Sequence, residues 1–575
     1  MKAKSPTPVH RSRAQDVQAA LQTLGARVHN ARSFLPGERP TWVVVELSGA
    51  PSLRVERPKF LGIPIPTKKL GPSLEDLTRA LDTLGDTSWI RGVVLRIEGL
   101  RADGVVAYSL REAIARLTRK GKKTQAYLSQ LSLGSLYLAS AAAEVVVPES
   151  AEIDLRGLGI SMQFYGDALA RHGIRFEKVA IAEYKNAFDT LSRGEMTPAQ
   201  REQLTALLDR LGDHYLGEIA ASRRLPVETV KALFDEGITS AARARDAGLV
   251  DRLAYEDELL EKTHRLYPEA KRFLKVKVPK ASKKRVAVVM LQGGIISGKS
   301  KRSPVPLGPL GNRVAGSETV VCALREAASD PATAAVVLYV DSGGGSALAS
   351  DLIGREVKRI QSRIPVVAVM GNVAASGGYY VLTHASKVIA APSTITGSIG
   401  VLTGKLVVEG LFEKLGVKTE RIEKGRHALL FDTARGLSDE DKALLAKQNQ
   451  EIYGRFVARV SEGRGLPLER VHEIAKGRVW SGAAAVEIGL VDELGDLDLG
   501  IMRARELAGL APDAPVVYVD GPDDYVLPAA PDAAVRLTGL TGLRELGDTT
   551  ALFEALRPLL SERSWLVGPG LMCIG

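Results

Sequence analysis

An internal repeat constrains this sequence more than any other feature. Gly-Val-Val-Leu at 92–95 is matched by Ala-Val-Val-Leu at 335–338, at an offset of 243 residues. Val147-Pro148 is matched by Ala391-Pro392 at an offset of 244, and the stretch 240–253 is matched by 481–494 at an offset of 241. Matches at such a constant spacing indicate two copies of one domain in tandem, so one fold must suit both copies.

Short runs rich in valine and isoleucine alternate with helical patterns in each copy. Strands are expected at 42–47, 92–95, 176–182, 285–291 and 335–338, and helices at 73–84 and 318–328. Apolar runs without alternation are typical of parallel strands that are buried on both faces and joined by crossover helices. The sequence therefore predicts an α/β fold, present twice.

The repeat divides the chain into five segments. They are an N-terminal amphipathic helical segment (1–40), a first α/β repeat (41–266), a basic linker (267–284), a second α/β repeat (285–510) and a C-terminal extension (511–575). The apolar, proline-containing stretches at 60–66 and 304–310 are expected to line the mouth of a site, to touch lipid, or to serve as a lid or an oligomer contact. The leucines of the last expected helices are Leu537, Leu540, Leu543 and Leu546.

Composition excludes several classes of protein. With 45% hydrophobic and 25% charged residues, the chain has the composition of a soluble globular protein. Eight basic residues between 271 and 285 lack the interleaved aromatic residues of a single-strand platform, so nucleic-acid binding is not expected. Two cysteines make neither a disulfide framework nor a metal site, and we expect no metal and no cofactor. No apolar run is long enough for a signal peptide or a membrane span.

The segment 373–380 reads Val-Ala-Ala-Ser-Gly-Gly-Tyr-Tyr and offers a candidate nucleophile, Ser376, at the expected start of a helix. The first amides of a helix have no intrahelical partner and favour negative charge, so an acyl oxyanion would be stabilised beside this serine. The glycines allow the backbone to approach a substrate closely. The structural alternative is an N-cap serine followed by two packing glycines.

Comparison of the two copies separates scaffold from candidate chemistry. The position of Ser376 is held by Ser132 in the first copy, but Leu133 follows it instead of glycine. Asp-Ser-Gly-Gly-Gly-Ser at 341–346 in the second copy is matched by Glu-Gly-Leu at 98–100 in the first. Only the second copy therefore has a glycine nest whose amides could bind an oxyanion.

This glycine run does not match a phosphate-binding loop. Leu348 stands where a dinucleotide fingerprint beginning at Gly343 requires glycine. Gly404-Lys405 fails as a Walker loop, because Ile399 and Leu406 occupy its glycine and Ser/Thr positions.

A nucleophilic serine needs a general base, and Lys185 is the preferred candidate. Of the histidines, His384 and His427 lie in the second copy near the motif, and His384 would point away from Ser376 about two helical turns further on. Aligning Phe188-Asp189 with Phe431-Asp432 sets Ala428 opposite Lys185, so the first copy keeps a lysine that the second has lost. The alternative is an ordinary surface lysine. As a base at neutral pH, Lys185 must be buried enough to lose roughly 3–4 kcal/mol of ion solvation.

Taken together, these motifs give the chain a specific family resemblance. Tyr184-Lys185-Asn186-Ala187, the segment around Ser376, Pro392-Ser393-Thr394, and Thr-Gly-Ser-Ile-Gly at 396–400 resemble the long, tandem-repeat form of the bacterial signal peptide peptidase A family, a relative of the caseinolytic protease and crotonase superfamily. The likeness covers about 41–510. It implies a crotonase-like α/β fold and a homo-tetrameric bowl with the active sites inside.

The resemblance also implies roles for particular residues. Ser376 would be the nucleophile, Lys185 the general base and Ser398 the hydroxyl that orients the lysine amine. The amides of Gly377 and of the pair Gly344-Gly345 would form the oxyanion hole. The substrates would be short apolar peptides such as signal-peptide remnants, cleaved through an acyl-enzyme.

Two departures from the family pattern stand out. Gly343 replaces the proline of the family's Ser-Pro-Gly-Gly loop, and the membrane anchor common in the family is not evident. The location is thus left open between the cytoplasm and a peripheral membrane contact. Two other functions remain as alternatives, a crotonase-type acyl-CoA enzyme and a catalytically inert scaffold of a membrane-side complex.

Overall fold

The structure is a computed structural model of the chain. It describes residues 39–54, 72–102, 104–259, 264–275, 284–302 and 313–521, isolated helical residues before 31, and the backbone of short strands at 59–60, 63–64, 523–525 and 565–567. Most of the expected N-terminal helix, residues 276–283 of the basic linker, the stretch 304–310 and the leucines of the expected C-terminal helices lie outside the described residues.

The described chain forms two compact units. Unit 1 contains residues 1–158 and 212–281, and unit 2 contains residues 159–211 and 282–575. The units do not coincide with the sequence repeats, because residues 159–211 belong to the first repeat by sequence but to unit 2 by contacts. The physical reason is a β-ladder, since β9 (Arg175–Ala180) pairs along its whole length with β21 (Leu402–Val407) of the second repeat.

Unit 1 is built on a six-stranded sheet in the order β10-β7-β5-β4-β1-β11. All its pairings are parallel, as the uninterrupted apolar runs predict. Helix α2 (Leu74–Asp86) begins with a capping box between Ser73 and Asp76, and it contacts α3 (Gly104–Arg119). The strands are β1 (Trp42–Gly49), β4 (Gly92–Leu100), β5 (Lys123–Leu128), β7 (Glu144–Val147), β10 (Arg252–Leu253) and β11 (His264–Leu266).

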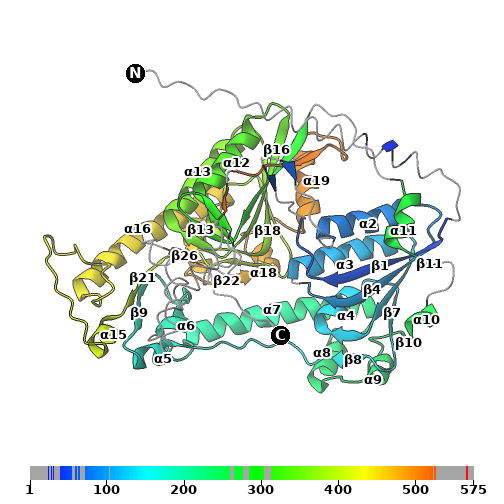
Figure 1. Cartoon of the computed structure of the whole chain (residues 1–575), viewed down its shortest axis with the longest axis horizontal. Coiled ribbons are helices and arrows are strands. Elements are labelled where there is room, and N and C mark those ends of the chain that lie inside the picture. Colours follow the sequence, from blue (N-terminus) through cyan, green and yellow to red (C-terminus); the bar gives the residue numbers. More distant parts are fainter. Residues whose placement is uncertain are drawn as a thin grey trace. The chain divides into compact units, whose positions relative to one another are not determined.

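Unit 2 repeats this plan around a sheet in the order β22-β20-β18-β16-β12-β24, with β19 and β23 attached beside β18. Its central pairs are parallel, and β22 is antiparallel to β20. Helices α12 (Ser317–Ser329) and α13 (Ala347–Gln361) contact each other over this sheet (Figure 1). The strands are β12 (Arg285–Gln292), β16 (Thr333–Ser342), β18 (Val366–Ala375), β19 (Lys387–Ala390), β20 (Ile395–Gly397), β22 (Val479–Ser481), β23 (Glu493–Leu494) and β24 (Val516–Tyr518).

A second sheet in unit 2 runs in the order β25-β14-β15-β13-β17-β26-β21-β9. The backbone of β26 (Trp565–Val567) lies between β17 (Gly344–Ser346) and β21 and is antiparallel to both. This sheet therefore joins the predicted glycine nest to the strand that leads to Lys185. Its other strands are β13 (Gly294–Ile296), β14 (Ser300–Arg302), β15 (Arg313–Gly316) and β25 (Asp523–Tyr525).

The remaining elements are short, apart from two long helices of 26 residues each, α7 (Pro198–Arg223) and α16 (Asp439–Arg464). The boundary between the units falls within α7. The other elements are β2 (Lys59–Phe60), β3 (Ile63–Pro64), β6 (Gln130–Ser132), β8 (Glu152–Asp154), α4 (Leu133–Ala139), α5 (Gly166–Arg171), α6 (Asp189–Ser192), α8 (Val227–Glu236), α9 (Ala241–Asp246), α10 (Glu256–Leu259), α11 (Tyr267–Ala270), η1 (Lys271–Phe273), α14 (Gly377–Tyr380), α15 (Glu409–Lys414), α17 (Leu468–Ile474), α18 (Gly482–Glu487) and α19 (Leu497–Leu507).

Candidate active site

Ser376 lies at a sharp corner between β18 and α14. Its backbone is at φ 56° and ψ −115°, a left-handed conformation that costs an L-residue roughly 1–3 kcal/mol. The corner is fixed by two hydrogen bonds, one from Ser376 N–H to Gly397 O (2.8 Å) and one from Tyr380 N–H to Ser376 O (2.8 Å). The side chain makes no capping hydrogen bond, so Ser376 Oγ is not used to start the helix.

The two glycines after Ser376 are required by close packing. A Cβ on Gly378 would lie 2.3 Å from the carbonyl oxygen of Ser342, and one on Gly377 would lie 2.5 Å from Ser350 Oγ. The same hypothetical Cβ of Gly377 would be 3.2 Å from both Gly344 Cα and Gly345 N. The corner after Ser376 and the glycine nest are therefore in direct contact.

Lys185 reaches Ser376 from the segment after β9. Its Nζ lies 2.7 Å from Ser376 Oγ, 2.9 Å from Ser398 O and 3.1 Å from Ser398 Oγ. Ser376 has no exposed surface, and Lys185 and Ser398 are each 2% exposed. The structure thus brings together three side chains that the sequence analysis selected, and all three belong to unit 2.

The surroundings of Lys185 disfavour a charged amine. Burial holds the pKa of Lys185 well below its usual value, and the nearby positive charge of Lys178 lowers this pKa further. The three hydrogen bonds of Nζ involve two hydroxyls and a carbonyl, so no carboxylate offsets the lost hydration. Lys178 itself forms an ion pair with the buried Asp189.

Several residues that hold Lys185 in place were missed by the sequence analysis. Gly477 has φ +78°, and a Cβ there would lie 2.6 Å from Lys185 N and 2.8 Å from Lys185 Cα. A Cβ on Gly400 would lie 3.3 Å from Lys185 Cδ. Buried Gln203 donates to Tyr184 O (3.2 Å) and accepts from Val479 N–H (3.3 Å), and so ties the lysine segment to β22. No local motif marks these residues, because their partners are distant in the chain.

The glycine nest has the conformation expected of a loop that presents amides. Gly344 and Gly345 have φ values of +101° and +156°, and a Cβ on Gly345 would clash with Ile295 O at 2.0 Å. The Gly344 amide donates to Ser342 Oγ (3.1 Å). Gly343, which stands at the family's proline position, has no positive φ, and a Cβ there would meet nothing within 4 Å. Replacement of proline by glycine thus places no special steric demand on this position.

Ser132, the counterpart of Ser376 in the first copy, is an N-cap serine, the structural alternative considered for Ser376. Its Oγ accepts a hydrogen bond from Ser135 N–H in a capping box at the start of α4, and its backbone is extended at φ −109°. The histidines near the motif bond elsewhere. His384 contacts Thr383 and Glu462, and His427 contacts Asp441.

Among the described residues, no group of three or more histidine, cysteine, aspartate or glutamate side chains is arranged to hold a metal ion. Nor does any helix among these residues combine the length and apolarity that a membrane crossing requires.

Comparison with known proteins gives a consistent result. The model of peptidase family S49 matches the chain twice, at residues 116–267 and 358–511. The chain is 32% identical over 441 residues to "Serine protease SPPA, chloroplastic" of Arabidopsis thaliana, a match that covers 75% of this chain and 65% of that protein. It is 30% identical over 459 residues to "Protease 4" of Salmonella typhi, covering 76% of this chain and 72% of that protein.

A solved structure of ClpP1 from Listeria monocytogenes is 17% identical, with a TM-score of 0.23, and the match covers 37% of this chain and 94% of that one. The two separate family matches confirm the tandem α/β duplication that the repeat predicts.

Proposed function

Because this chain belongs to peptidase family S49 and is a serine peptidase, we propose that it cleaves peptides with a dyad of Ser376 and Lys185. The observation that carries the proposal is the 2.7 Å distance between Lys185 Nζ and Ser376 Oγ. Burial of both groups favours a neutral amine, which is the form that can accept a proton.

The hydrogen bonds of Lys185 suit a neutral amine. A neutral amine has two N–H bonds and one lone pair. Ser398 can accept both N–H bonds, through its carbonyl (2.9 Å) and its hydroxyl (3.1 Å), so the lone pair is left to accept the Ser376 O–H. Ser398 is therefore the orienting residue in this proposal.

The reaction would proceed in two halves. Ser376 Oγ attacks the scissile carbonyl carbon while its proton moves to Lys185 Nζ, and the tetrahedral intermediate collapses with transfer of that proton to the leaving amine. A water molecule then gives a proton to Lys185 and attacks the acyl ester. Return of the proton to Ser376 Oγ releases the acid product and restores the dyad.

The oxyanion of each tetrahedral intermediate would be stabilised by backbone amides. Gly377 N–H lies at the first turn after the nucleophile, and the glycine nest is in contact with Gly377. Since the Gly344 amide already donates to Ser342 Oγ, Gly345 is the better second donor of the pair.

An extended peptide fits the β-structure beside the dyad. β26 runs antiparallel to β17 at Gly344–Ser346, which demonstrates that a strand can be accommodated along the glycine nest. A substrate bound in this way would gain main-chain hydrogen bonds independent of its sequence. Short apolar peptides such as signal-peptide remnants are the proposed substrates, and peripheral membrane contact and a homo-tetramer are the proposed context.

Active-site labelling tests this function. A fluorophosphonate probe should label the wild-type chain, and labelling should be lost in Ser376→Ala and in Lys185→Met. Ser132→Ala is the matched control, because this serine occupies the equivalent position but caps a helix, and its labelling should equal that of the wild type. An apolar fluorogenic peptide should be hydrolysed by the wild type and by the Ser132 variant only.

The same variants separate the alternatives. An acyl-CoA enzyme would turn over thioesters and not peptides, and would not lose its activity in Lys185→Met. An inert scaffold would show no labelling in the wild type. Either result would refute the proposed dyad.

A further inference from the structure

Arg478 forms an aromatic stack beside the proposed dyad that the proposed chemistry does not use. Its guanidinium carbon lies 5.0 Å from the ring centroid of Tyr184 and 5.0 Å from that of Trp480. The same guanidinium forms an ion pair with Glu202 (3.1 Å), and the Tyr184 hydroxyl donates to the other carboxylate oxygen of Glu202 (3.0 Å). We call these four residues the arginine clamp.

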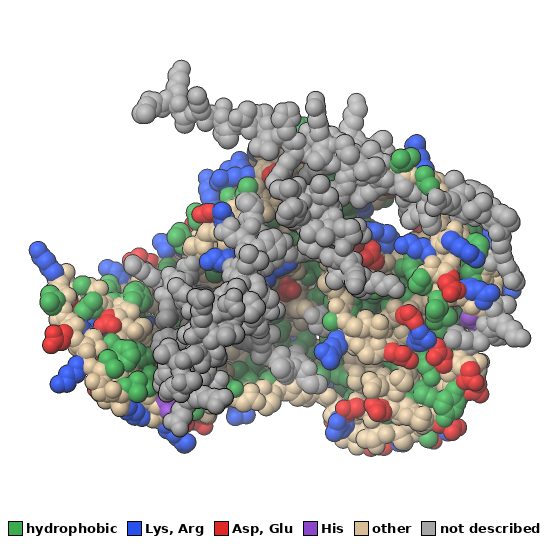
Figure 2. Space-filling model, viewed as in Figure 1, with side chains coloured by type: hydrophobic (Ala, Val, Ile, Leu, Met, Phe, Trp, Pro, Cys, Tyr) green, Lys and Arg blue, Asp and Glu red, His purple; other side chains and the backbone are tan. Residues whose placement is uncertain are grey.

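The ordinary interpretation of such a group is a surface ion pair. The side chain of Glu202 is 55% exposed and that of Arg478 is 24% exposed. Figure 2 shows basic and acidic side chains interspersed over the visible face of the described chain, and an exposed ion pair by itself contributes little to stability. A guanidinium over an aromatic ring is held more firmly, because the planar cation is attracted to the ring face. The role of the clamp therefore depends on what its members hold in place.

One side of the clamp holds the backbone that carries Lys185. Tyr184 directly precedes this lysine; its N–H donates to Lys476 O (3.1 Å), and its carbonyl accepts from Gln203 (3.2 Å). Glu202 and Gln203 are consecutive residues of α7, so one turn of this helix binds both the hydroxyl and the carbonyl of Tyr184. The start of the lysine side chain is fixed from this side.

The other side of the clamp holds the acceptor of the lysine amine. Ser398, whose carbonyl and hydroxyl oxygens bind Lys185 Nζ, donates its own N–H to Arg478 O (2.7 Å). The φ of Ser398 is 50°, a left-handed value that persists only where neighbouring residues enforce it. Trp480 is one such neighbour, because a Cβ on Gly397 would lie 2.8 Å from Trp480 Cδ1. The end of the lysine side chain is thus fixed by the backbone around Arg478.

We propose that Arg478 is a positioning residue for the general base, an inference that rests on the proposed dyad. Its guanidinium joins Tyr184, which precedes Lys185, to Trp480, which packs beside Ser398. Removal of the guanidinium frees the two segments to separate, and the amine then loses its alignment with the serine hydroxyl. In this role Arg478 acts only through Lys185 and Ser398.

Arg478→Met tests the positioning role, since methionine keeps part of the side-chain volume and removes the guanidinium. We expect kcat for an apolar fluorogenic peptide to fall about tenfold, with KM within about twofold of the wild type, because the base is misaligned while the edge of β17 is unchanged. As the segments separate, water reaches the amine and favours its charged form, so the rising limb of kcat/KM against pH should move to higher pH. A loss of stability alone would not move this limb.

Arg478→Lys separates stacking from charge. A lysine retains a positive charge opposite Glu202 but lacks the planar guanidinium that lies over both rings. It should therefore recover only a small part of the kcat that Arg478→Met loses. Full recovery would refute a role for the stack.

Glu202→Gln is a second variant, at an exposed position where the substitution leaves folding intact. Its amide oxygen still accepts from the Tyr184 hydroxyl, but the side chain carries no charge for Arg478. It should lower kcat about threefold, with the pH limb moved in the same direction as in Arg478→Met.

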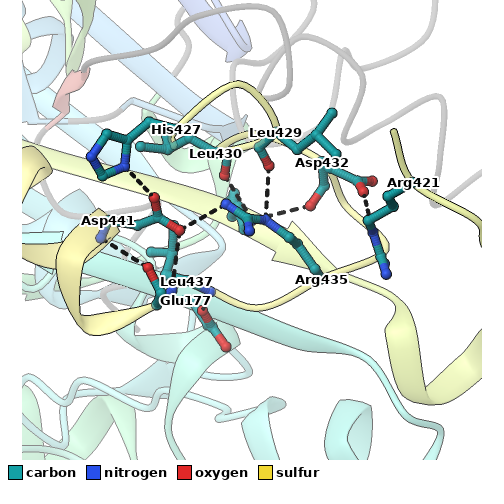
Figure 3. Close-up of polar contacts among 11 residues, drawn as sticks. Glu177, Arg421, His427, Leu429, Leu430, Asp432, Arg435, Leu437 and Asp441 are labelled. Carbon is teal, nitrogen blue, oxygen red and sulfur yellow. Dashed lines mark hydrogen bonds and ion pairs between the residues drawn. The ribbon is translucent and has the colours of Figure 1, made fainter. Parts of the chain in front are cut away.

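Two other arginines serve as matched controls. Arg39 lies 5.1 Å from the Trp89 ring in unit 1, so Arg39→Met removes a stacked guanidinium from the unit that does not contain the dyad. Arg435 lies in unit 2, is 23% exposed, pairs with Asp441 (2.9 Å) and donates to Leu429 O (3.0 Å) in the network of Figure 3. Arg435→Met should lower the urea midpoint, because Asp441 is buried, and both controls should leave kcat within about twofold of the wild type and the pH limb unmoved.

The proposal is overturned if Arg478→Met keeps kcat within about twofold of the wild type, if its pH limb does not move, or if Arg39→Met is equally impaired. Fluorophosphonate labelling separates this failure from a failure of the dyad. Labelling of the wild type but not of Ser376→Ala, together with unimpaired clamp variants, refutes only the role of Arg478. A wild-type chain that is not labelled refutes the dyad and, with it, this inference.

Discussion

Gly477 offers a quantitative test of how tightly Lys185 must be held. In Gly477→Ala, the new Cβ would lie 2.6 Å from Lys185 N and 2.8 Å from Lys185 Cα, whereas ordinary contact begins at 3.4 Å. Both neighbours are backbone atoms and cannot rotate away, so relief requires a shift of about 0.8 Å between the two segments. A misplacement of about 1 Å can reduce catalysis by roughly 100-fold, and we expect a loss of that order in kcat/KM.

The matched control is Gly465→Ala. Gly465 ends α16 with φ +65°, and a Cβ there would meet nothing within 4 Å. Both variants carry the strain of a left-handed alanine, roughly 1–2 kcal/mol, but only Gly477→Ala pushes on Lys185.

The assay is hydrolysis of a fluorogenic apolar peptide, with the fluorophosphonate labelling rate and the urea unfolding midpoint measured on the same samples. The reasoning is refuted if Gly477→Ala retains activity within about threefold of the wild type, or if Gly465→Ala is equally impaired.

Three other predictions concern the charge of Lys185 and the edge of β17, along which β26 lies. Removal of a like charge in Lys178→Met should raise the pKa of Lys185, so the rising limb of kcat/KM against pH should move to higher pH; an unchanged profile would contradict this. The pKa of Lys185 is lowered in the folded state, so below pH 10.5 the unfolded chain binds a proton that the folded chain does not. The free energy of unfolding is therefore undiminished above pH 10.5 and decreases as the pH falls from 10.5 toward the lowered pKa. Lys185→Met should therefore raise the urea midpoint at pH 7, and the gain should shrink near pH 10.5; a gain independent of pH would be inconsistent with desolvation. β26 occupies the edge of β17 where a substrate strand is proposed to bind, and a chain shortened to end before Trp565 lacks β26. Peptide hydrolysis by the shortened chain should increase severalfold, through a lower KM and not through a higher kcat.

The sheets were predictable because their sequence signal is local. The valine-rich runs at 42–47, 285–291 and 335–338 all become parallel strands, since a strand covered on both faces leaves no polar alternation in the sequence. The helix expected from Ser376 is only four residues long, because the left-handed corner of Ser376 turns the chain sharply and Val381–His384 continue as turns.

The proximity of Lys185 and Ser376 was expected from complementary loss between the copies, and their catalytic roles remain proposals. The residues that pack against Lys185 were not predictable. Gly477 is one of 56 glycines, and only its spatial neighbour distinguishes it from the others. The assignment of 159–211 to unit 2 was also missed, since a repeat marks ancestry whereas a compact unit reflects contacts such as those of β9 with β21.

The long separation between amine and hydroxyl has a bearing on biosynthesis. Lys185 leaves the ribosome 191 residues before Ser376, and Gly477, which packs against Lys185, follows later still. A nascent chain therefore cannot assemble the reactive pair until most of the polypeptide has been made. Fragments released early in translation would carry a lysine without its serine, and the cell would be spared stray hydrolysis from incomplete copies.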